Sequence, residues 1–247
     1  MKTPKFWFKN RYNLLSLILL PLSLFWILGT LINKIKFRKI SKCKVPVICI
    51  GNITAGGSGK TPITIALAKL FKKQNKNVHI IYKAFNVSVK KNCMKVNIKD
   101  SSLKVGDEPL ILAKAATTWI CKKRQYGINK AINSGADIIL LDDGLQDDTI
   151  HKDYSIMVIN EKQGFGNRHL IPAGPLRCNI KSGLKKADCI FFYGAKKNLQ
   201  SLLPNNNKKI ILIGTISKFI LIASSAMAVA VYAGLFKKFT FTPSFNF

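Results

Sequence analysis

The sequence predicts an α/β fold in which helices flank a parallel sheet, with a separate apolar helix at the N-terminus. Two observations predict the sheet: a short apolar strand leads into a glycine-rich segment and a helix, and a later apolar strand ends in two acidic residues. A third observation, a long apolar run between basic flanks, predicts the separate helix. The chain has 247 residues, 48% of them hydrophobic, which is enough for one α/β domain with an appendage.

The N-terminal apolar run extends from Leu14 to Ile32 and is about long enough to cross the hydrocarbon of a bilayer. Basic residues flank it on both sides, and aromatic residues lie near its ends, as is typical of membrane interfaces. Residues 1–44 are therefore expected to form a membrane-associated helix with basic flanks. The sequence leaves open whether this helix spans the bilayer or lies in one leaflet. In both cases the heavier positive charge on its C-terminal side places the body of the protein in the cytosol, and export by a cleaved signal is not favoured.

The segment GNITAGGSGKTP, from Gly51 to Pro62, has the residue types that bind the phosphates of a nucleoside triphosphate. Glycines let successive backbone N–H groups converge on phosphate oxygens, a lysine reaches the outer phosphates, and a hydroxyl binds magnesium. The predicted nucleotide-binding residues are Thr54, Ala55, Gly56, Gly57, Ser58, Gly59, Lys60 and Thr61. Thr54 stands where the phosphate-loop pattern has its first glycine. The segment favours a P-loop NTPase-like fold and phosphoryl transfer over a merely flexible turn.

The flanks of this segment support the interpretation, because residues 45–50 are typical of a buried strand and residues 63–71 have the periodicity of a helix. Strand, loop and helix therefore follow in the order that a phosphate loop requires. Residues 78–82 are predicted to form the next strand. His79 lies inside that apolar run, so we expect a core residue rather than a ligand.

Two acidic residues, Asp107 and Glu108, precede a helix that the sequence predicts from Leu110 to Trp119. Carboxylates in this position commonly cap a helix and complement its dipole. Asp107 could otherwise accept the proton of an attacking hydroxyl. From the residues alone the two interpretations remain open.

The apolar residues 136–141 are predicted to form a strand that ends in Asp142 and Asp143. Such a strand, of the Walker B type, delivers an acid to the magnesium beside a phosphate loop. The alternative is a surface turn after a buried strand. Because a phosphate loop precedes it, we favour a magnesium site formed by Thr61, Asp142 and Asp143.

A glycine- and proline-rich segment at residues 164–177 ends in Arg177, a residue suited to gripping a phosphate. Alone it indicates only a structured loop. Residues 187–194 are predicted to form a further strand.

The net charge is +29, from 40 lysine and arginine residues against 11 aspartate and glutamate residues, which points to a polyanionic partner. The basic residues are spread along the chain without a nucleic-acid motif, so a membrane surface is favoured and no specific nucleic acid is expected. The six cysteines are widely spaced, and neither a zinc site nor a disulfide framework is expected, as in a reducing cytosol.

The segments GNITAGGSGKTP, VGDEP, DDGLQ, GFGN and LIPAGPLR follow in this order after an apolar helix, and together they resemble the tetraacyldisaccharide 4'-kinase family of lipid A biosynthesis. The resemblance covers approximately residues 1–215. It implies an enzyme at the cytoplasmic face of the bacterial inner membrane that uses ATP and Mg²⁺. The implied reaction transfers the γ-phosphate to the 4'-hydroxyl of tetraacyldisaccharide 1-phosphate, giving lipid IVA.

The resemblance also implies roles for matching residues within a kinase domain at residues 45–209. Lys60 and Thr61 would hold phosphates and magnesium, with Lys60 acting in catalysis, and Asp142 and Asp143 would be the Walker B acids. Asp107 would be the base toward the sugar hydroxyl, and Arg177 would lie in the substrate region.

The chain departs from the family pattern at three places within this domain. The family has Ser-Arg-Gly-Tyr-Gly where this chain has residues 82–86, YKAFN, so an arginine is missing. The histidine after the DDG motif is Asp147 here, and the glutamate after PAGPLR is Cys178.

Residues 210–247 are expected to form an apolar tail unlike the family, and residues 210–235 could be a second membrane segment. A second C-terminal lobe is accordingly expected to be incomplete, as in a truncated or frameshifted product. The alternatives to an active kinase are an inactive remnant that still binds nucleotide and a membrane-associated P-loop ATPase. The sequence carries no information on oligomeric state.

Overall fold

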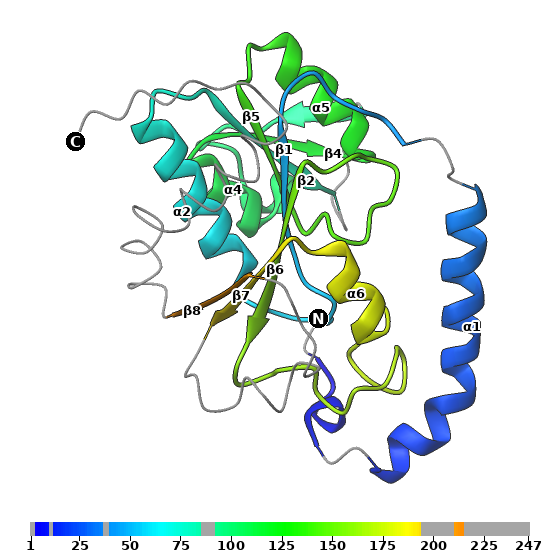
Figure 1. Cartoon of the computed structure of the whole chain (residues 1–247). Coiled ribbons are helices and arrows are strands. Elements are labelled where there is room, and N and C mark those ends of the chain that lie inside the picture. Colours follow the sequence, from blue (N-terminus) through cyan, green and yellow to red (C-terminus); the bar gives the residue numbers. More distant parts are fainter. Residues whose placement is uncertain (1–2, 10–11, 37–39, 85–91, 194–209, 215–247) are drawn as a thin grey trace.

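An eight-stranded sheet forms the centre of the computed structural model, which describes residues 3–9, 12–36, 40–84, 92–193 and 210–214 (Figure 1). The strand order is β3-β4-β2-β5-β1-β6-β7-β8. Neighbouring strands pair in parallel, except for the antiparallel pair of β3 and β4. The predicted parallel sheet is therefore confirmed. The strands are β1 (Val47–Gly51), β2 (Val78–Lys83), β3 (Cys93–Lys95), β4 (Thr117–Cys121), β5 (Ile138–Asp142), β6 (Tyr154–Asn160), β7 (Cys189–Tyr193) and β8 (Ile210–Gly214).

Helices cover both faces of the sheet (Figure 1). One face carries α2 (Lys60–Lys73) and α4 (Asp107–Ala113), and the other carries α5 (Arg124–Asn133) and α6 (Ile180–Lys186). The short α3 (Ser102–Val105) precedes α4. This arrangement is the layered α/β architecture that the alternation of strands and helices predicts.

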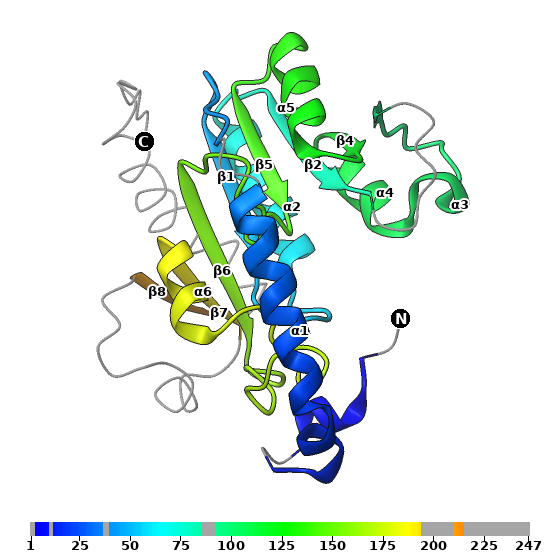
Figure 2. The ribbon, with the colours of Figure 1, turned by 90° about the vertical axis from the view of Figure 1, so that its right-hand side faces the viewer.

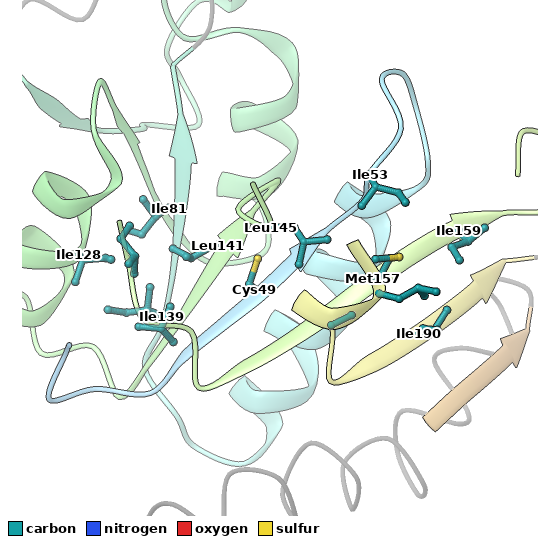
Figure 3. Packing of buried hydrophobic residues seen from close by; sticks show 14 of the residues in the cluster. Cys49, Ile53, Ile81, Ile128, Ile139, Leu141, Leu145, Met157, Ile159 and Ile190 are labelled. Carbon is teal, nitrogen blue, oxygen red and sulfur yellow. The ribbon is translucent and has the colours of Figure 1, made fainter. Parts of the chain in front are cut away.

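Two hydrophobic cores lie on opposite faces of the sheet, because successive side chains of a strand point to opposite sides. In β1, Ile48 and Ile50 pack with residues of α2 and α4, whereas Val47 and Cys49 pack with residues of α5 and α6. Figure 3 shows the second core, in which side chains from β1, β2, β5, β6 and β7 meet α5. All five residues of β1 are buried, so the strand that leads into the glycine-rich loop is fixed on both sides.

The helix predicted from Leu110 to Trp119 is wrong in its second half. Helix α4 ends at Ala113, and Thr117–Cys121 forms β4, which pairs with β2 on one side and β3 on the other. The sequence TTWIC is rich in β-branched and aromatic residues, which pack well on a pleated sheet. Pairing on both edges therefore decides the conformation of this segment.

The sheet also extends beyond the predicted end of the domain at residue 209. Ile210–Gly214 forms β8, which pairs in parallel with β7. These five residues, expected to begin an apolar tail, are thus part of the sheet. Residues 215–247, including the rest of the predicted second membrane segment, lie outside the described residues.

The apolar N-terminal run forms α1 (Leu14–Lys36), preceded by the 3-10 helix η1 (Lys5–Phe8). Its segment Leu14–Ile32 has a mean hydropathy of 2.3 and is long enough to cross a membrane by length and composition alone. Figures 1 and 2 show α1 outside the sheet, on the side of α6. Most of its large apolar side chains are exposed, with Leu14 at 73% and Phe25 at 71%.

The structure confirms the expectation for His79 and differs from the expectation for the cysteines. His79 is buried, accepts a hydrogen bond at Nδ1 from Trp119 Nε1 at 3.2 Å and has a pKa that burial lowers, so its assignment to the core is confirmed. No disulfide framework was expected from the cysteine spacing, but the structure joins one pair of cysteines, Cys93 and Cys121. They face each other across the antiparallel strands β3 and β4, a relation that depends on strand register and not on any cysteine motif.

Candidate functional site

The glycine-rich loop lies between the end of β1 and the start of α2, as predicted. Gly56 has a φ of +113° and Gly59 a φ of +82°, values at which side chains are disfavoured. Gly59 is the residue immediately before α2, so the loop runs directly into the N-terminus of a helix. Backbone N–H groups at such a terminus attract phosphate.

The start of this loop is braced by the segment that contains Arg177. Ala55 N donates to Pro175 O at 2.7 Å, and Arg177 N donates to Ile53 O at 2.7 Å. Thr54 lies between these two bonds and is buried. A threonine therefore fits where the pattern has glycine, because this position is part of a short bridge between two backbone segments.

A cavity of about 380 Å³ brings most of the predicted site residues together. Its lining consists of the loop from Gly56 to Pro62 and of Tyr82, Lys83, Glu108, Asp142, Asp143 and Arg177. Gly56 to Thr61 are thus placed as predicted, whereas Thr54 and Ala55 are not among the lining residues. Inside the loop, the buried Ser58 hydroxyl has no hydrogen-bond partner among the described residues, so it is free to bind an oxygen of a ligand.

Lys60 is the first residue of α2, and its side chain is largely buried in the wall of this cavity. Its Nζ lies 3.1 Å from Asn52 Oδ1 and 3.5 Å from Asp143 Oδ1. The ammonium group is therefore held between the end of β1 and the end of β5. Asn52 was not predicted from the sequence as a partner of Lys60.

Asp142 and Asp143 occupy different environments although they are adjacent. Asp142 ends β5, is 2% exposed and accepts a hydrogen bond from Thr64 Oγ1 at 3.0 Å. Burial raises the pKa of Asp142 to about 6, against the smaller opposing effects of Thr64 and Lys60. A buried carboxylate with few donors is a group that a cation would stabilise.

Asp143 has a φ of +55°, which turns its carboxylate toward the cations around the cavity. Arg177 Nη1 donates to both oxygens of Asp143, at 3.0 and 2.9 Å. Burial alone would raise the pKa of Asp143, but the charges of Lys60 and Arg177 outweigh it and lower the pKa. Arg177 is therefore attached to the site through its ion pair with Asp143.

The turn that carries both acids is held from behind by Arg124, the first residue of α5. Arg124 Nη2 donates to the carbonyl oxygens of Asp142 and Asp143, at 3.2 and 2.8 Å, and Arg124 is 3% exposed. Arg124 was not predicted as a site residue, because one arginine among many basic residues gives no signal of its own in the sequence.

Asp107 and Glu108 form the start of α4, and both are exposed. Glu108 lines the cavity and accepts a hydrogen bond at 2.8 Å from the hydroxyl of Tyr82. Asp107 is not among the lining residues. Burial and the Glu108 hydrogen bond raise the pKa of Tyr82. The sequence predicted no site role for Glu108, a neighbour of Asp107, or for Tyr82, the last residue of the strand predicted at residues 78–82.

Comparison with known proteins shows the family. The sequence model of LpxK, tetraacyldisaccharide-1-P 4'-kinase, matches residues 15–230. The chain belongs to the tetraacyldisaccharide-1-P 4'-kinase family. The match confirms the resemblance drawn from the motifs and extends into the region expected to differ from the family.

Several kinases of this family are similar along most of the chain. The tetraacyldisaccharide 4'-kinase of Parvibaculum lavamentivorans is 36% identical over 197 residues, and that of Jannaschia sp. is 38% identical over 194 residues. Each alignment covers 78% of this chain, but only 57% and 58% of the respective kinase. The chain thus spans less than two thirds of the length of these relatives.

A solved structure of the same kinase family supports the fold. The crystal structure of LpxK from Aquifex aeolicus in complex with ATP superposes with a TM-score of 0.67 at 30% sequence identity. The superposition covers 81% of this chain and 64% of the Aquifex chain. The predicted α/β sheet with flanking helices is therefore the fold of the family.

Proposed function

We propose that this chain is an ATP-dependent lipid kinase that transfers the γ-phosphate to the 4'-hydroxyl of tetraacyldisaccharide 1-phosphate, giving lipid IVA. The observation that carries the proposal is the cavity in which the phosphate loop, two acids and Arg177 meet. Membership of the family supplies the acceptor, and the ATP complex of the Aquifex relative supports ATP as the donor.

ATP would be bound by the backbone of the loop and by Lys60. The loop backbone at Gly56 and Gly59 and the N-terminus of α2 suit the phosphates, and the unpartnered Ser58 hydroxyl adds a donor. Lys60 would stabilise charge on the transferred phosphoryl group. The contacts of Lys60 with Asn52 and Asp143 keep its ammonium group at the cavity.

Thr61, Asp142 and Asp143 are the residues that would hold Mg²⁺. Their hydroxyl and carboxylate oxygens are the donors that this ion prefers, and all three residues line the cavity. When bound, Mg²⁺ neutralises phosphate charge during transfer. The raised pKa of the buried Asp142 fits a carboxylate whose charge is stabilised by a cation in the working enzyme.

Asp107 is the residue we propose as the base toward the acceptor hydroxyl. It is exposed at the start of α4, next to Glu108 of the cavity wall, and so could reach an acceptor that enters from the open side. Arg177 would contribute to binding the anionic substrate, because it lines the same cavity.

We further propose that α1 lies along the cytoplasmic surface of the bacterial inner membrane and does not span it. Ser16 and Ser23 of α1 are buried, and each forms a hydrogen bond with the loop between β6 and α6. In a spanning helix these bonds would be broken or would lie in hydrocarbon, where unpaired polar groups are costly. An in-plane helix keeps them, inserts its apolar face into the leaflet and brings the cavity to the lipid acceptor.

The test is transfer of labelled γ-phosphate from ATP to tetraacyldisaccharide 1-phosphate in mixed micelles, with Lys60→Ala as the control. We expect product from the unaltered chain, at least about a hundredfold less with Lys60→Ala, and loss of nucleotide affinity in the same variant. Nucleotide binding without product would favour a remnant that has lost transfer. ATP hydrolysis that does not depend on the lipid would favour a membrane-associated ATPase.

A further inference from the structure

Arg177 is held at three separate points, one of which comes from the N-terminal helix. Its backbone N–H donates to Ile53 at the start of the phosphate loop, at 2.7 Å. Its backbone carbonyl accepts a hydrogen bond from Trp26 Nε1 of α1, at 3.0 Å. Its guanidinium group binds Asp143 at the end of β5. One residue thus connects α1, the phosphate loop and a proposed metal ligand.

The contact of Trp26 is the last in a polar stripe along α1. Ser16 Oγ accepts a hydrogen bond from Asn167 Nδ2 at 2.7 Å, and Ser23 Oγ donates to Leu170 O at 3.1 Å. Spacings of seven and three residues place Ser16, Ser23 and Trp26 on one side of a helix. The stripe fixes the rotation of α1, and Trp26 is therefore directed at the same loop as the two serines.

Most of the other large side chains of α1 between Leu14 and Ile32 are apolar and exposed. Phe25, next to Trp26 in sequence, is 71% exposed. Adjacent residues of α1 therefore lie on different sides of the helix, Phe25 on the exposed side and Trp26 on the side that contacts the loop. One face of α1 is consequently exposed, and the other face contacts Arg177. Displacement of α1 would move the carbonyl group of Arg177 with it.

We propose that Trp26 is a positioning residue that couples the seating of α1 to the geometry of the phosphate site. By holding the backbone of Arg177, Trp26 keeps the guanidinium group on Asp143, and the hydrogen bond from Arg177 N to Ile53 O reports whether that backbone is held. A membrane surface that seats α1 would thereby order the site. The inference rests on the proposed function for the identity of the ligands, but its structural part concerns the chain alone.

The N-terminal region offers a matched control at Trp7. Trp7 Nε1 donates to Pro172 O at 2.9 Å, and Trp7 O accepts from Asn167 N at 2.8 Å. Trp7 therefore binds the same loop through the same group, the indole N–H. The residue that it binds, Pro172, has no bond to Asp143 among the described contacts. Trp7→Phe and Trp26→Phe each remove one indole N–H and keep an aromatic ring.

The first measurement is amide hydrogen exchange of the full chain in detergent micelles without nucleotide. Trp26→Phe should speed exchange in peptides that contain Arg177, whose N–H is bonded to Ile53, and Trp7→Phe should leave that amide protected. Exchange at Arg177 that is the same in Trp26→Phe and the unaltered chain would overturn the proposal. This readout holds even if the chain proves not to be a kinase.

The second measurement is the affinity for a fluorescent ATP analogue, determined with Mg²⁺ and with a chelator. Trp26→Phe should weaken binding about three- to tenfold with Mg²⁺ and much less without it, because the hydrogen bond acts through Arg177 on Asp143. A purely structural defect would weaken both affinities alike and would overturn the proposal. Arg177→Lys should have the larger effect, and adding Trp26→Phe to it should cost little more. Full additivity of the two variants would argue against the coupling.

Discussion

Arg124 and Asp147 form a largely buried ion pair beside the turn that carries Asp142 and Asp143. Arg124 Nη1 lies 3.0 Å from Asp147 Oδ2, and the other terminal nitrogen of Arg124 holds the carbonyl groups of Asp142 and Asp143. Asp147 also accepts hydrogen bonds from the backbone and hydroxyl of Thr149. Asp147, which stands where the family pattern has a histidine, is thus the counterion of Arg124. Arg124 in turn holds the turn that carries Asp142 and Asp143.

Asp147→Asn should destabilise the protein by roughly 2–3 kcal/mol, because it leaves the guanidinium group of Arg124 buried without its counterion. Burial alone would raise the pKa of Asp147, but Thr149 and Arg124 outweigh it and lower the pKa, so the charged form contributes to stability. Urea unfolding in detergent micelles measures the change. The control is Asp148→Asn, since Asp148 pairs with Lys186 at a more exposed position and should cost less than about 1 kcal/mol. Equal losses of stability in the two variants would show that the ion pair of Arg124 with Asp147 contributes no more to stability than the more exposed pair of Asp148 with Lys186.

Asp142→Asn and Asp143→Asn should change stability in opposite directions when Mg²⁺ and nucleotide are absent. Burial raises the pKa of Asp142 to about 6 from 3.8, so its ionisation opposes folding above that pH, on the order of 1–3 kcal/mol. Asn removes this penalty and can still accept the hydrogen bond of Thr64. The pKa of Asp143 is lowered, so its charged form stabilises the fold and Asn should reduce stability at neutral pH.

The sign of the pH dependence follows from the same shifts. Between about pH 4 and 6 the folded chain binds more protons at Asp142 than the unfolded chain, so this residue lowers stability as the pH rises through that window. Asp142→Asn should therefore have its largest stabilising effect above pH 6 and little effect near pH 4. Thermal unfolding of both variants across this range checks the prediction. A loss of stability in Asp142→Asn at pH 7 would contradict the assigned burial penalty.

The parts of the site that could be predicted from the sequence are those whose signals are local. The loop from Gly56 to Thr61 follows a strand and begins a helix, and each of these features has a pattern in adjacent residues. Asp142 and Asp143 could be predicted for the same reason, as acids at the end of an apolar run.

The rest depends on contacts between distant segments. The first three residues of β4 were predicted as helix, because the strand conformation of this segment is decided by pairing with β2 and β3. β6 was not predicted from the sequence, and its place in the sheet depends on pairing with β1 and β7. The role of Arg124 depends on the sheet order that brings the start of α5 to the end of β5, and Trp26 meets Arg177 only when α1 docks.

An in-plane α1 predicts that both of its ends lie on the cytoplasmic side of the membrane. Tyr12→Cys, before the helix, and Ile40→Cys, after it, would introduce thiols at exposed positions. The partly exposed Cys43 and Cys178 are first replaced by serine so that they do not react. An impermeant maleimide should label both new thiols in inverted membrane vesicles and neither in intact spheroplasts. Labelling of Tyr12→Cys from outside would instead show that α1 spans the bilayer.

The adjacent acids at the start of α4 should separate proton transfer from the organisation of the cavity. Asp107→Ala should reduce phosphoryl transfer at least about a hundredfold, as expected for loss of a general base, and leave nucleotide affinity within about twofold. Glu108→Gln, whose side chain lines the cavity and accepts the hydrogen bond of Tyr82, should instead change nucleotide affinity. Measuring transfer and nucleotide affinity for both variants distinguishes the two roles. If Asp107→Ala retains turnover and Glu108→Gln abolishes it without changing nucleotide affinity, the base is Glu108, the acid that lines the cavity together with the phosphate loop.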